Sequence, residues 1–246
     1  MKKQLILGLL TALPLVANAE TENGWSGTGE FGLVMSRGNA DTDTLNAKLD
    51  LKHEDEAWLH NVYVLALRAE ASDIKTANRF EVGGKSGYKF NERHYIAGVA
   101  RYENDDFASY ESQWTVAVTY GVNLIDSEAT KLIFEVGPGF RHFDPVPFVF
   151  SEVPPIVIDP ESDSDFMLRG FVDFKHQFNE STAIYNTFLA EAGEDNTFMQ
   201  DDIGVMVKMN ASLALKAGFQ FRRNSDVPFG VDKTDTLTTV NVVYGF

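Results

Sequence analysis

The chain has 246 residues, a formal net charge of −15 and no cysteine. The lack of cysteine excludes disulfides, a thiolate nucleophile and a lipidated cysteine, and the acidic balance argues against a nucleic-acid partner. Hydrophobic residues make up 44% of the chain. That fraction fits a periplasmic β-protein or a membrane barrel, because barrel strands alternate apolar and polar residues.

The first 19 residues are typical of a secretory signal peptide. Two lysines follow Met1, residues 5–16 are mostly apolar, and Ala17-Asn18-Ala19 fits the small-x-small cleavage pattern. We predict cleavage between Ala19 and Glu20, which changes the formal charge to about −17 because the two lysines leave with the signal. Beyond residue 19 no run of 18 apolar residues occurs, so we expect no transmembrane helix.

Alternation of apolar and polar residues predicts about twelve β-strands. The clearest pair is the hairpin over residues 114–141, in which Val116, Val118 and Tyr120 share one face. The predicted strands cover residues 24–36, 43–54, 57–71, 77–90, 94–104, 114–125, 131–141, 166–178, 182–192, 200–209, 213–222 and a last strand ending at Phe246. The facing of strands 57–71, 94–104 and 182–192 is ambiguous. For 57–71 we favour Tyr63, Leu65 and Leu67 outward, which turns Arg68 and Glu70 inward.

Two features favour a barrel over a β-sandwich. The predicted connections alternate between tight and longer, as the periplasmic turns and extracellular loops of outer-membrane barrels do. Aromatic residues also cap the apolar stripes, as expected at the two membrane interfaces. The sequence therefore predicts one all-β domain, residues 20–246, folded as a transmembrane antiparallel β-barrel of about twelve strands.

Several stretches resemble the YdiY-like family of outer-membrane proteins, which share the domain DUF481 and include proteins called salt-induced outer membrane proteins. The similarity is carried by residues 120–141, above all Glu135 to Arg141, by Arg37-Gly38-Asn39, and by the closing segment 239–246. The resemblance implies a location in the outer membrane of a Gram-negative bacterium. The alternating end, with Tyr244 and Phe246, looks like the signal read by the barrel-assembly machinery. The resemblance implies almost nothing about a substrate.

Charged residues on the predicted inner face suggest a polar lumen. We expect either a narrow pore for small solutes or ions, linked to salt or envelope stress by the family name, or an ion-pair network that fills a packed scaffold. The pore-lining candidates are Arg68, Glu70, Arg79, Glu81, Lys85, Lys131, Glu135, Arg141, Arg169, Asp173 and Lys175. We expect Glu135 and Arg141 to belong to one lumen network.

Two segments depart from regular alternation. Gly137-Pro138-Gly139 lies within a strand, and because proline cannot donate to a β-ladder we expect a bulge near the outer rim, or else a strand that ends by residue 137. Residues 144–165 are acidic, proline-rich and predicted to be irregular. We interpret them as a solvated lid, although Asp159, Glu161, Asp163 and Asp165 could hold Ca²⁺ weakly through oxygen ligands.

We expect no enzyme, because neither a Gly-x-Ser-x-Gly motif nor metal-ligand spacing occurs, and His142 beside Asp144 is the only candidate catalytic pair. A third possibility is a structural or adhesion barrel that acts through its acidic loops. The expected partners are outer-membrane lipid and lipopolysaccharide, the barrel-assembly machinery during biogenesis, and small solutes or ions. No cofactor, metal or nucleic acid is expected.

Overall fold

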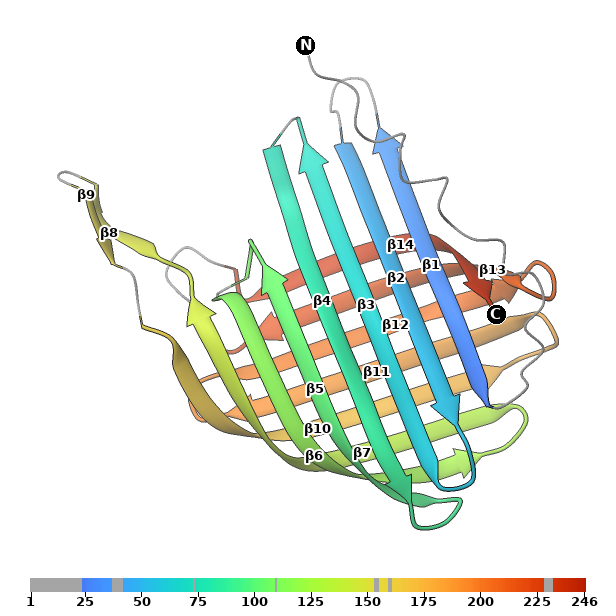
Figure 1. Ribbon diagram of the computed structural model, residues 1–246. Coiled ribbons are helices and arrows are strands. Elements are labelled where there is room, and N and C mark those ends of the chain that lie inside the picture. Colours follow the sequence, from blue (N-terminus) through green and yellow to red (C-terminus); the bar gives the residue numbers. More distant parts are fainter. Residues whose placement is uncertain are drawn as a thin grey trace.

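The computed structural model describes residues 24–36, 42–72, 74–108, 110–152, 155–158, 161–227 and 232–246. In this part of the chain twelve antiparallel strands close into a barrel, and two short strands form a separate hairpin (Figure 1). The barrel strands are β1 (Trp25–Ser36), β2 (Thr42–Glu54), β3 (Trp58–Ala71), β4 (Ile74–Lys89), β5 (His94–Asp105), β6 (Tyr110–Asp126), β7 (Thr130–Pro145), β10 (Asp163–Gln177), β11 (Thr182–Gly193), β12 (Thr197–Lys208), β13 (Leu213–Asn224) and β14 (Thr234–Gly245). The prediction of an all-β barrel of about twelve strands is confirmed.

Each barrel strand pairs with the strands before and after it in the barrel order, and β1 closes the ring by pairing with β14. None of the described residues forms a helix long and apolar enough to cross a bilayer. The predicted signal peptide and the cleavage position at Ala19 and Glu20 lie outside the described residues.

Several strands are longer than predicted, so the expected sorting of loop lengths is only partly present. Strand β4 begins at Ile74 and β6 at Tyr110, which leaves connections of 72–73 and 106–109 after β3 and β5. The connection between β11 and β12, residues 194–196, is also short. Polar residues that we expected to form loops instead extend the strands, because each strand gains ladder hydrogen bonds from its neighbours.

Pro138 does not produce the predicted bulge, and β7 does not end there. The pairing of β7 with β10 is continuous through Pro138 opposite Leu168. On the β6 side, the pairing passes from Ala117–Gly139 to Tyr120–Val136 without a change of register. The strand therefore tolerates a residue without an N–H by losing a local part of one ladder while keeping the other.

The segment 144–165 is also more regular than predicted. Strand β7 extends to Pro145 and β10 begins at Asp163, while β8 (Phe148–Glu152) and β9 (Pro155–Ile158) pair as an antiparallel hairpin outside the barrel. Figure 1 shows this hairpin projecting from the barrel rim beyond β7. The segment thus contains a hairpin and is not irregular as predicted, whereas its role as a lid stays a prediction.

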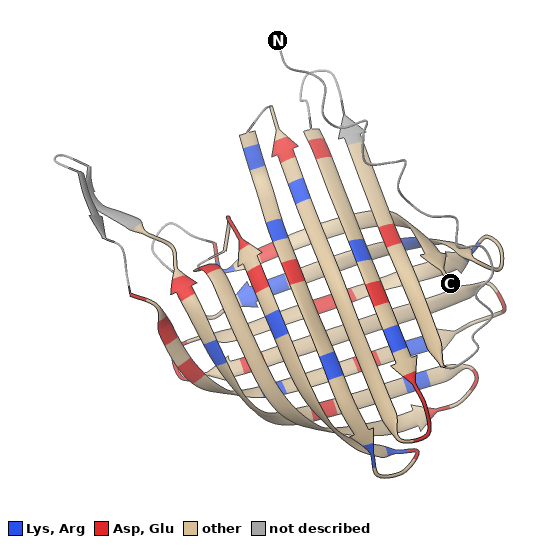
Figure 2. Ribbon diagram, in the orientation of Figure 1, with Lys and Arg blue, Asp and Glu red and all other residues tan. Residues whose placement is uncertain are grey.

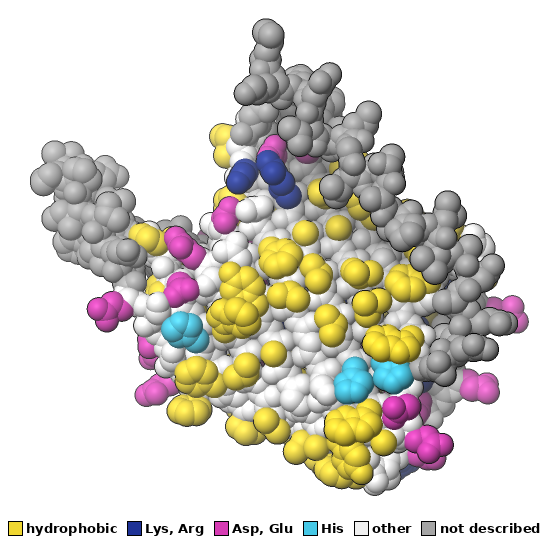
Figure 3. All heavy atoms as spheres, viewed as in Figure 1, with side chains coloured by type: hydrophobic (Ala, Val, Ile, Leu, Met, Phe, Trp, Pro, Cys, Tyr) yellow, Lys and Arg dark blue, Asp and Glu magenta, His cyan; other side chains and the backbone are white. Residues whose placement is uncertain are grey.

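The outer wall of the barrel is apolar. Large hydrophobic side chains are exposed along the strands, including Val116, Val118, Leu168, Val205 and Val240. Figure 3 shows such side chains gathered over the strands on one face of the molecule. Water would disfavour so much exposed apolar surface, whereas the hydrocarbon of a bilayer would cover it.

Aromatic side chains border this apolar wall at both ends. Toward the tight turns, Trp58 packs edge-on against Tyr88 with ring centroids 5.3 Å apart, and Tyr244 stacks near Phe246. Toward the opposite rim, Tyr102 lies 4.6 Å from Trp114 and Phe140 lies 5.6 Å from Phe166. Such rings are typical of the two membrane interfaces of a transmembrane barrel.

The C-terminal residue closes the barrel at the turn end. The Gly27 N–H donates to the Phe246 carbonyl at 2.7 Å, and the Phe246 N–H donates back to the Gly27 carbonyl at 2.9 Å. The Phe246 ring lies on Gly27, so that a Cβ there would be 2.5 Å from the ring. The position of the Phe246 ring therefore requires a glycine at residue 27 of β1.

Candidate functional site: the charged lumen

Strand β3 faces opposite to our prediction. Tyr63 donates a hydrogen bond to Glu81 inside the barrel at 2.6 Å, and Leu65 lines the same cavity. Arg68 and Glu70 instead form an ion pair on the outer side, where the Arg68 side chain is 56% exposed. Their predicted inward placement is wrong, because β3 carries apolar residues on both faces and hydrophobicity alone could not choose between them.

The inner walls of the described strands enclose a cavity of about 400 Å³. It extends from the turn end, where Lys52, Lys89 and Asn91 line it, to Arg101 and Arg169 farther along the barrel. Figure 2 shows that charged residues lie along the strands themselves as well as at the rims. Six of the predicted pore-lining residues border this cavity: Arg79, Glu81, Lys85, Glu135, Arg169 and Asp173.

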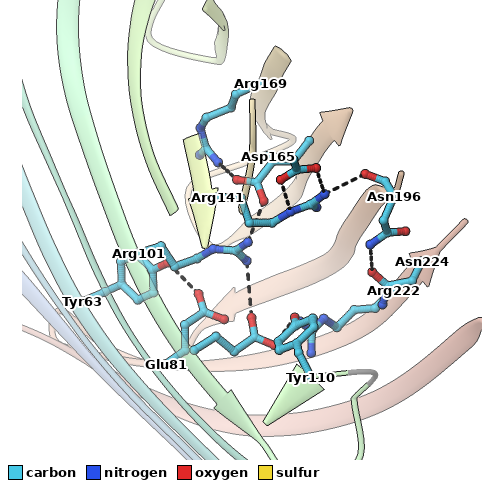
Figure 4. A network of polar contacts seen from close by, with 12 residues as sticks. Tyr63, Glu81, Arg101, Tyr110, Arg141, Asp165, Arg169, Asn196, Arg222 and Asn224 are labelled. Carbon is cyan, nitrogen blue, oxygen red and sulfur yellow. Dashed lines mark hydrogen bonds and ion pairs between the residues drawn. The ribbon is translucent and has the colours of Figure 1, made fainter. Parts of the chain in front are cut away.

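Ion pairs cross the lumen and limit the cavity on the loop side (Figure 4). Arg101 of β5 donates to Glu191 of β11 at 2.6 Å, and Arg169 of β10 donates to the other oxygen of Glu191 at 2.6 Å. Arg101 also lies 3.4 Å from Glu103 on its own strand. Glu103 and Glu191 are 0% exposed and Arg101 is 5% exposed.

A second group of contacts joins opposite walls. Arg222 of β13 donates to Glu103 of β5 and, at 3.2 Å, to Asp105. Strands β5 and β13 are six places apart in the ring of twelve, so this contact spans the full lumen. Tyr110 adds a hydrogen bond to Glu103 at 3.0 Å. We call Arg101, Glu103, Arg169, Glu191 and Arg222 the lumen network.

Acidic groups nearer the turn end are held by tyrosines as well as by lysines. Lys85 contacts Glu135 at 2.5 Å, and the Tyr95 hydroxyl donates to the same oxygen at 2.6 Å. Tyr185 similarly donates to Asp202 at 3.0 Å. These contacts fix charges on the wall of the cavity while most of its volume stays open.

Three tyrosines of the inner wall, Tyr63, Tyr95 and Tyr185, each lie over a glycine of the neighbouring strand. A Cβ at Gly121 would be 2.1 Å from the Tyr95 ring, and a Cβ at Gly83 would be 2.6 Å from the Tyr63 ring. Tyr185 covers Gly204 and Gly218 in the same way. The glycines make room for rings that lie against the inner wall, so each hydroxyl reaches an acid without blocking the cavity.

Arg141 lies on the inner wall beyond the lumen network and is 1% exposed. Its guanidinium binds Asp165 through two hydrogen bonds, of 3.0 and 2.5 Å, and donates to the Asn196 carbonyl at 2.9 Å. A Cβ at Gly193 would be 1.9 Å from Asp165 Oδ2. This close approach explains why a glycine ends β11 beside the bidentate pair.

The remaining predicted pore-lining residues lie at the turn end. Lys175 is opposite Lys131 in the β7–β10 register. Lys131 pairs with Asp126 at 3.4 Å and is largely exposed. These two lysines belong to the mouth of the barrel and not to the wall of the cavity. A role of any of these residues in conduction stays a prediction.

Among the described residues, neither the acidic loop nor the histidine pair forms the site that we predicted. Asp165 is occupied by Arg141, Asp159 lies outside the described residues, and no cluster able to hold a metal ion occurs among the residues that are described. His142 contacts the Ser164 hydroxyl at 2.8 Å, whereas Asp144 accepts hydrogen bonds from Ser112 and Ser162, each at 2.6 Å. The side-chain hydrogen bonds of both members of the pair thus go to serines.

Sequence reasoning missed most of the lumen network. The inner face of β5 begins with Tyr95, Ala97 and Val99 and ends with Arg101, Glu103 and Asp105. A search for one apolar and one polar face therefore fails on this strand. The available signal was the spacing of two between consecutive charged residues, which places them on one face of a strand.

The comparisons with known proteins agree with this fold. Residues 29–246 match the family described as "Protein of unknown function, DUF481". The chain belongs to the DUF481 family. It is 20% identical to the uncharacterized protein YdiY of Escherichia coli (strain K12) over 228 residues, which covers 92% of this chain and 85% of YdiY. The family resemblance predicted from the sequence is thus confirmed.

Two solved structures share the barrel fold of this DUF481 protein. One is the translocator domain of autotransporter NalP from Neisseria meningitidis, with a TM-score of 0.55, 10% identity, and coverage of 93% of this chain and 90% of that one. The other is the COG4313 outer membrane channel from Pseudomonas putida F1, with a TM-score of 0.51, 9% identity, and coverage of 91% and 96%. At these identities the similarity concerns the fold alone.

Proposed function

We propose that this DUF481 protein is a narrow channel of the bacterial outer membrane that carries small ions or solutes. In this structure, the lumen network would hold this channel closed. The observation that carries the proposal is a cavity of about 400 Å³, lined by charged side chains, that ends against ion pairs joining opposite walls. The apolar outer wall with its aromatic borders supports the membrane location. The channel named among the structural relatives supports the class of function.

The arrangement of the lumen network favours a gate over a permanent plug. Glu191 is shared by Arg101 and Arg169, and Glu103 is shared by Arg101 and Arg222. Each acid therefore has a second arginine to which it can shift when one contact breaks. Apolar side chains would fill a permanently closed lumen with similar stability, because buried ion pairs are costly to desolvate.

Single-channel conductance of the refolded mature protein in a planar bilayer tests the proposal. We expect small, brief openings of the wild type. Glu191→Gln leaves two arginines without their acid and should raise open probability and anion preference, whereas Arg101→Gln should shift the preference toward cations. Arg68→Gln is the matched control, because this arginine lies on the outer wall and should leave both quantities unchanged.

A second candidate function is a non-conducting scaffold that acts through its acidic loops. The full burial of Glu103 and Glu191 favours it, because an open pore would hydrate these groups. If the wild type and both lumen variants are inserted but silent, the channel proposal is wrong and the scaffold stands. A role in salt stress is a separate proposal, tested by the growth of a deletion strain and of an Arg101→Gln strain in high salt.

A further inference from the structure

The seam that closes the barrel is shorter than the other pairings between barrel strands. Backbone pairing across this seam runs from the Gly27–Phe246 hydrogen bonds to Phe31–Val242 and stops there. Strand β1 nevertheless pairs with β2 as far as Ser36, and β14 pairs with β13 as far as Thr234. In the described backbone, residues 32–36 of β1 and 234–241 of β14 thus form two edges that are not paired with each other.

The cavity lies directly behind this seam. Leu237, Thr239 and Asn241 of β14 line it, together with Glu30 of β1. On the outside of the same two strands, Phe31, Leu33, Val240 and Val242 are exposed apolar residues. Successive residues of each strand therefore point alternately to the lipid and to the cavity, so the apolar outer face and the cavity lining are one residue apart.

Asn241 marks the inner side of the seam. It is 3% exposed, and its Oδ1 is a buried acceptor that has no hydrogen-bond partner among the described atoms. Gly32 lies beside it, and a Cβ there would be 2.2 Å from this oxygen. A buried acceptor without a donor is costly, and once β1 and β14 separate at Gly32 a ligand hydroxyl or ammonium would satisfy it.

Two ion pairs stand near this acceptor, one tight and one long. Lys216 contacts Glu30 at 3.0 Å, and Lys48 lies 3.9 Å from Asp50. All four side chains line the cavity. Together they offer lysines for a phosphate and carboxylates for an ammonium, which suits a zwitterionic group more than a singly charged one. A cavity of about 400 Å³ is also within the usual range for a small-molecule site.

We propose that the loop-side half of the β1–β14 seam is a lateral opening for a single-chain zwitterionic amphiphile of the lysophosphatidylethanolamine type. The head group enters the cavity, where Asn241 accepts a hydrogen bond from it. The acyl chain stays in the bilayer against the apolar outer faces of β1 and β14. Because the lumen network closes the loop side, the seam connects the membrane with the cavity and its turn-end mouth. This inference does not depend on ion conduction.

Photolabelling with the seam locked and unlocked tests the inference. The probe is a lysophosphatidylethanolamine with a diazirine near its head group, added to liposomes that contain the refolded protein. Labelled residues are identified by mass spectrometry. We expect labels on Leu237 and Thr239, which face the cavity, as well as on Val242, which faces the lipid.

The lock is a cysteine pair, Leu33→Cys with Val240→Cys. Continued pairing beyond Phe31–Val242 would place these two residues opposite each other, and the chain has no other cysteine. Oxidation should abolish labelling of Leu237 and Thr239, leave Val242 labelled, and be reversed by a reductant. The matched control is the pair Val205→Cys with Ala217→Cys, two exposed residues already opposite each other on β12 and β13, whose oxidation should change nothing.

A second variant keeps the test independent of cross-linking. Asn241→Leu keeps the size of the side chain and removes the acceptor, so labelling of Thr239 should fall about tenfold, the equivalent of one hydrogen bond to a buried group. Heat-modifiable electrophoretic mobility verifies that each variant is folded. Absence of label on Leu237 and Thr239 in the wild type, or equal labelling before and after locking, would overturn the inference. Conductance of the same proteins is scored separately, so that either proposal can fail alone.

Discussion

Arg101 and Glu191 meet 2.6 Å apart in the lumen, although they come from strands β5 and β11, which are four places apart in the barrel. Their residues are 90 positions apart in the sequence, and both side chains are almost fully buried. This contact therefore ties together walls that share no backbone hydrogen bonds, and it contributes to the shape of the lumen as well as to its charge.

Removing one member of this pair should destabilise the barrel more than replacing the whole group. Glu191→Ala leaves Arg101 and Arg169 buried without an acid, and we expect a loss of roughly 3–5 kcal/mol in the free energy of unfolding. Replacing Arg101, Glu191 and Arg169 together by Met, Leu and Met should cost clearly less. Urea unfolding in lipid vesicles measures both, and equal losses for the single and triple variants would contradict the argument.

The glycines beneath inward tyrosines should be intolerant of side chains. Gly121→Ala places a Cβ against the Tyr95 ring and should disturb the hydrogen bond from Tyr95 to Glu135, at a cost of about 1–3 kcal/mol for overpacking. Gly98→Ala is the matched control, because nothing lies within 4 Å of a Cβ at that glycine. Comparable urea midpoints for the two variants would show that the ring can move freely.

The terminal aromatic should depend on Gly27 for barrel closure. Gly27→Val collides with the Phe246 ring, so we expect slower folding into lipid vesicles and a lower urea midpoint. Gly29→Val tests the specificity of this effect, since a Cβ at Gly29 meets nothing within 4 Å and Gly29 lies on the same strand. Folding is followed by heat-modifiable electrophoretic mobility, and identical behaviour of the two variants would refute the prediction.

The turn between β2 and β3 should respond to acid. Asp55 accepts hydrogen bonds from the N–H groups of Trp58 at 2.7 Å and Ala57 at 2.8 Å, and these bonds lower the pKa of the Asp55 carboxyl below its usual value. A pKa lowered by folding adds stability at neutral pH that is lost as the pH falls through the folded-state pKa. The stability difference between the wild type and Asp55→Ala should therefore shrink on acidification. Asp55→Asn, which keeps an acceptor but does not titrate, should lose stability less steeply with falling pH.

The barrel itself could be predicted from the sequence because its outer wall faces one uniform apolar solvent. Val116, Val118 and Tyr120 all point toward this apolar surrounding, so outward apolar residues alternate strictly with inward residues along β6. The inner wall has no such uniform requirement. Tyr63 and Leu65 face inward on β3 while Val62 is exposed outside, and alternation is lost there.

There is a second reason why the contacts of the lumen network could not be predicted from the sequence of each strand. Arg222 and Glu103 are 119 positions apart and meet only because the ring closes with a particular register. Single residues such as Glu135 and Arg169 could be placed on the inner wall from strand alternation. Their partners depend on strand tilt and stagger, which no single strand encodes.

The long central strands have a consequence outside the membrane. A strand needs about 9–11 residues to cross a bilayer, whereas β6 has 17 residues and β4 and β7 have 16 each. If the hydrocarbon is centred on the apolar band, several residues of hydrogen-bonded sheet stand above it on this side of the barrel. Antibodies or phages that approach the cell would then meet a fixed ridge of backbone, so the epitopes here should be conformational and should resist proteases that readily remove flexible loops.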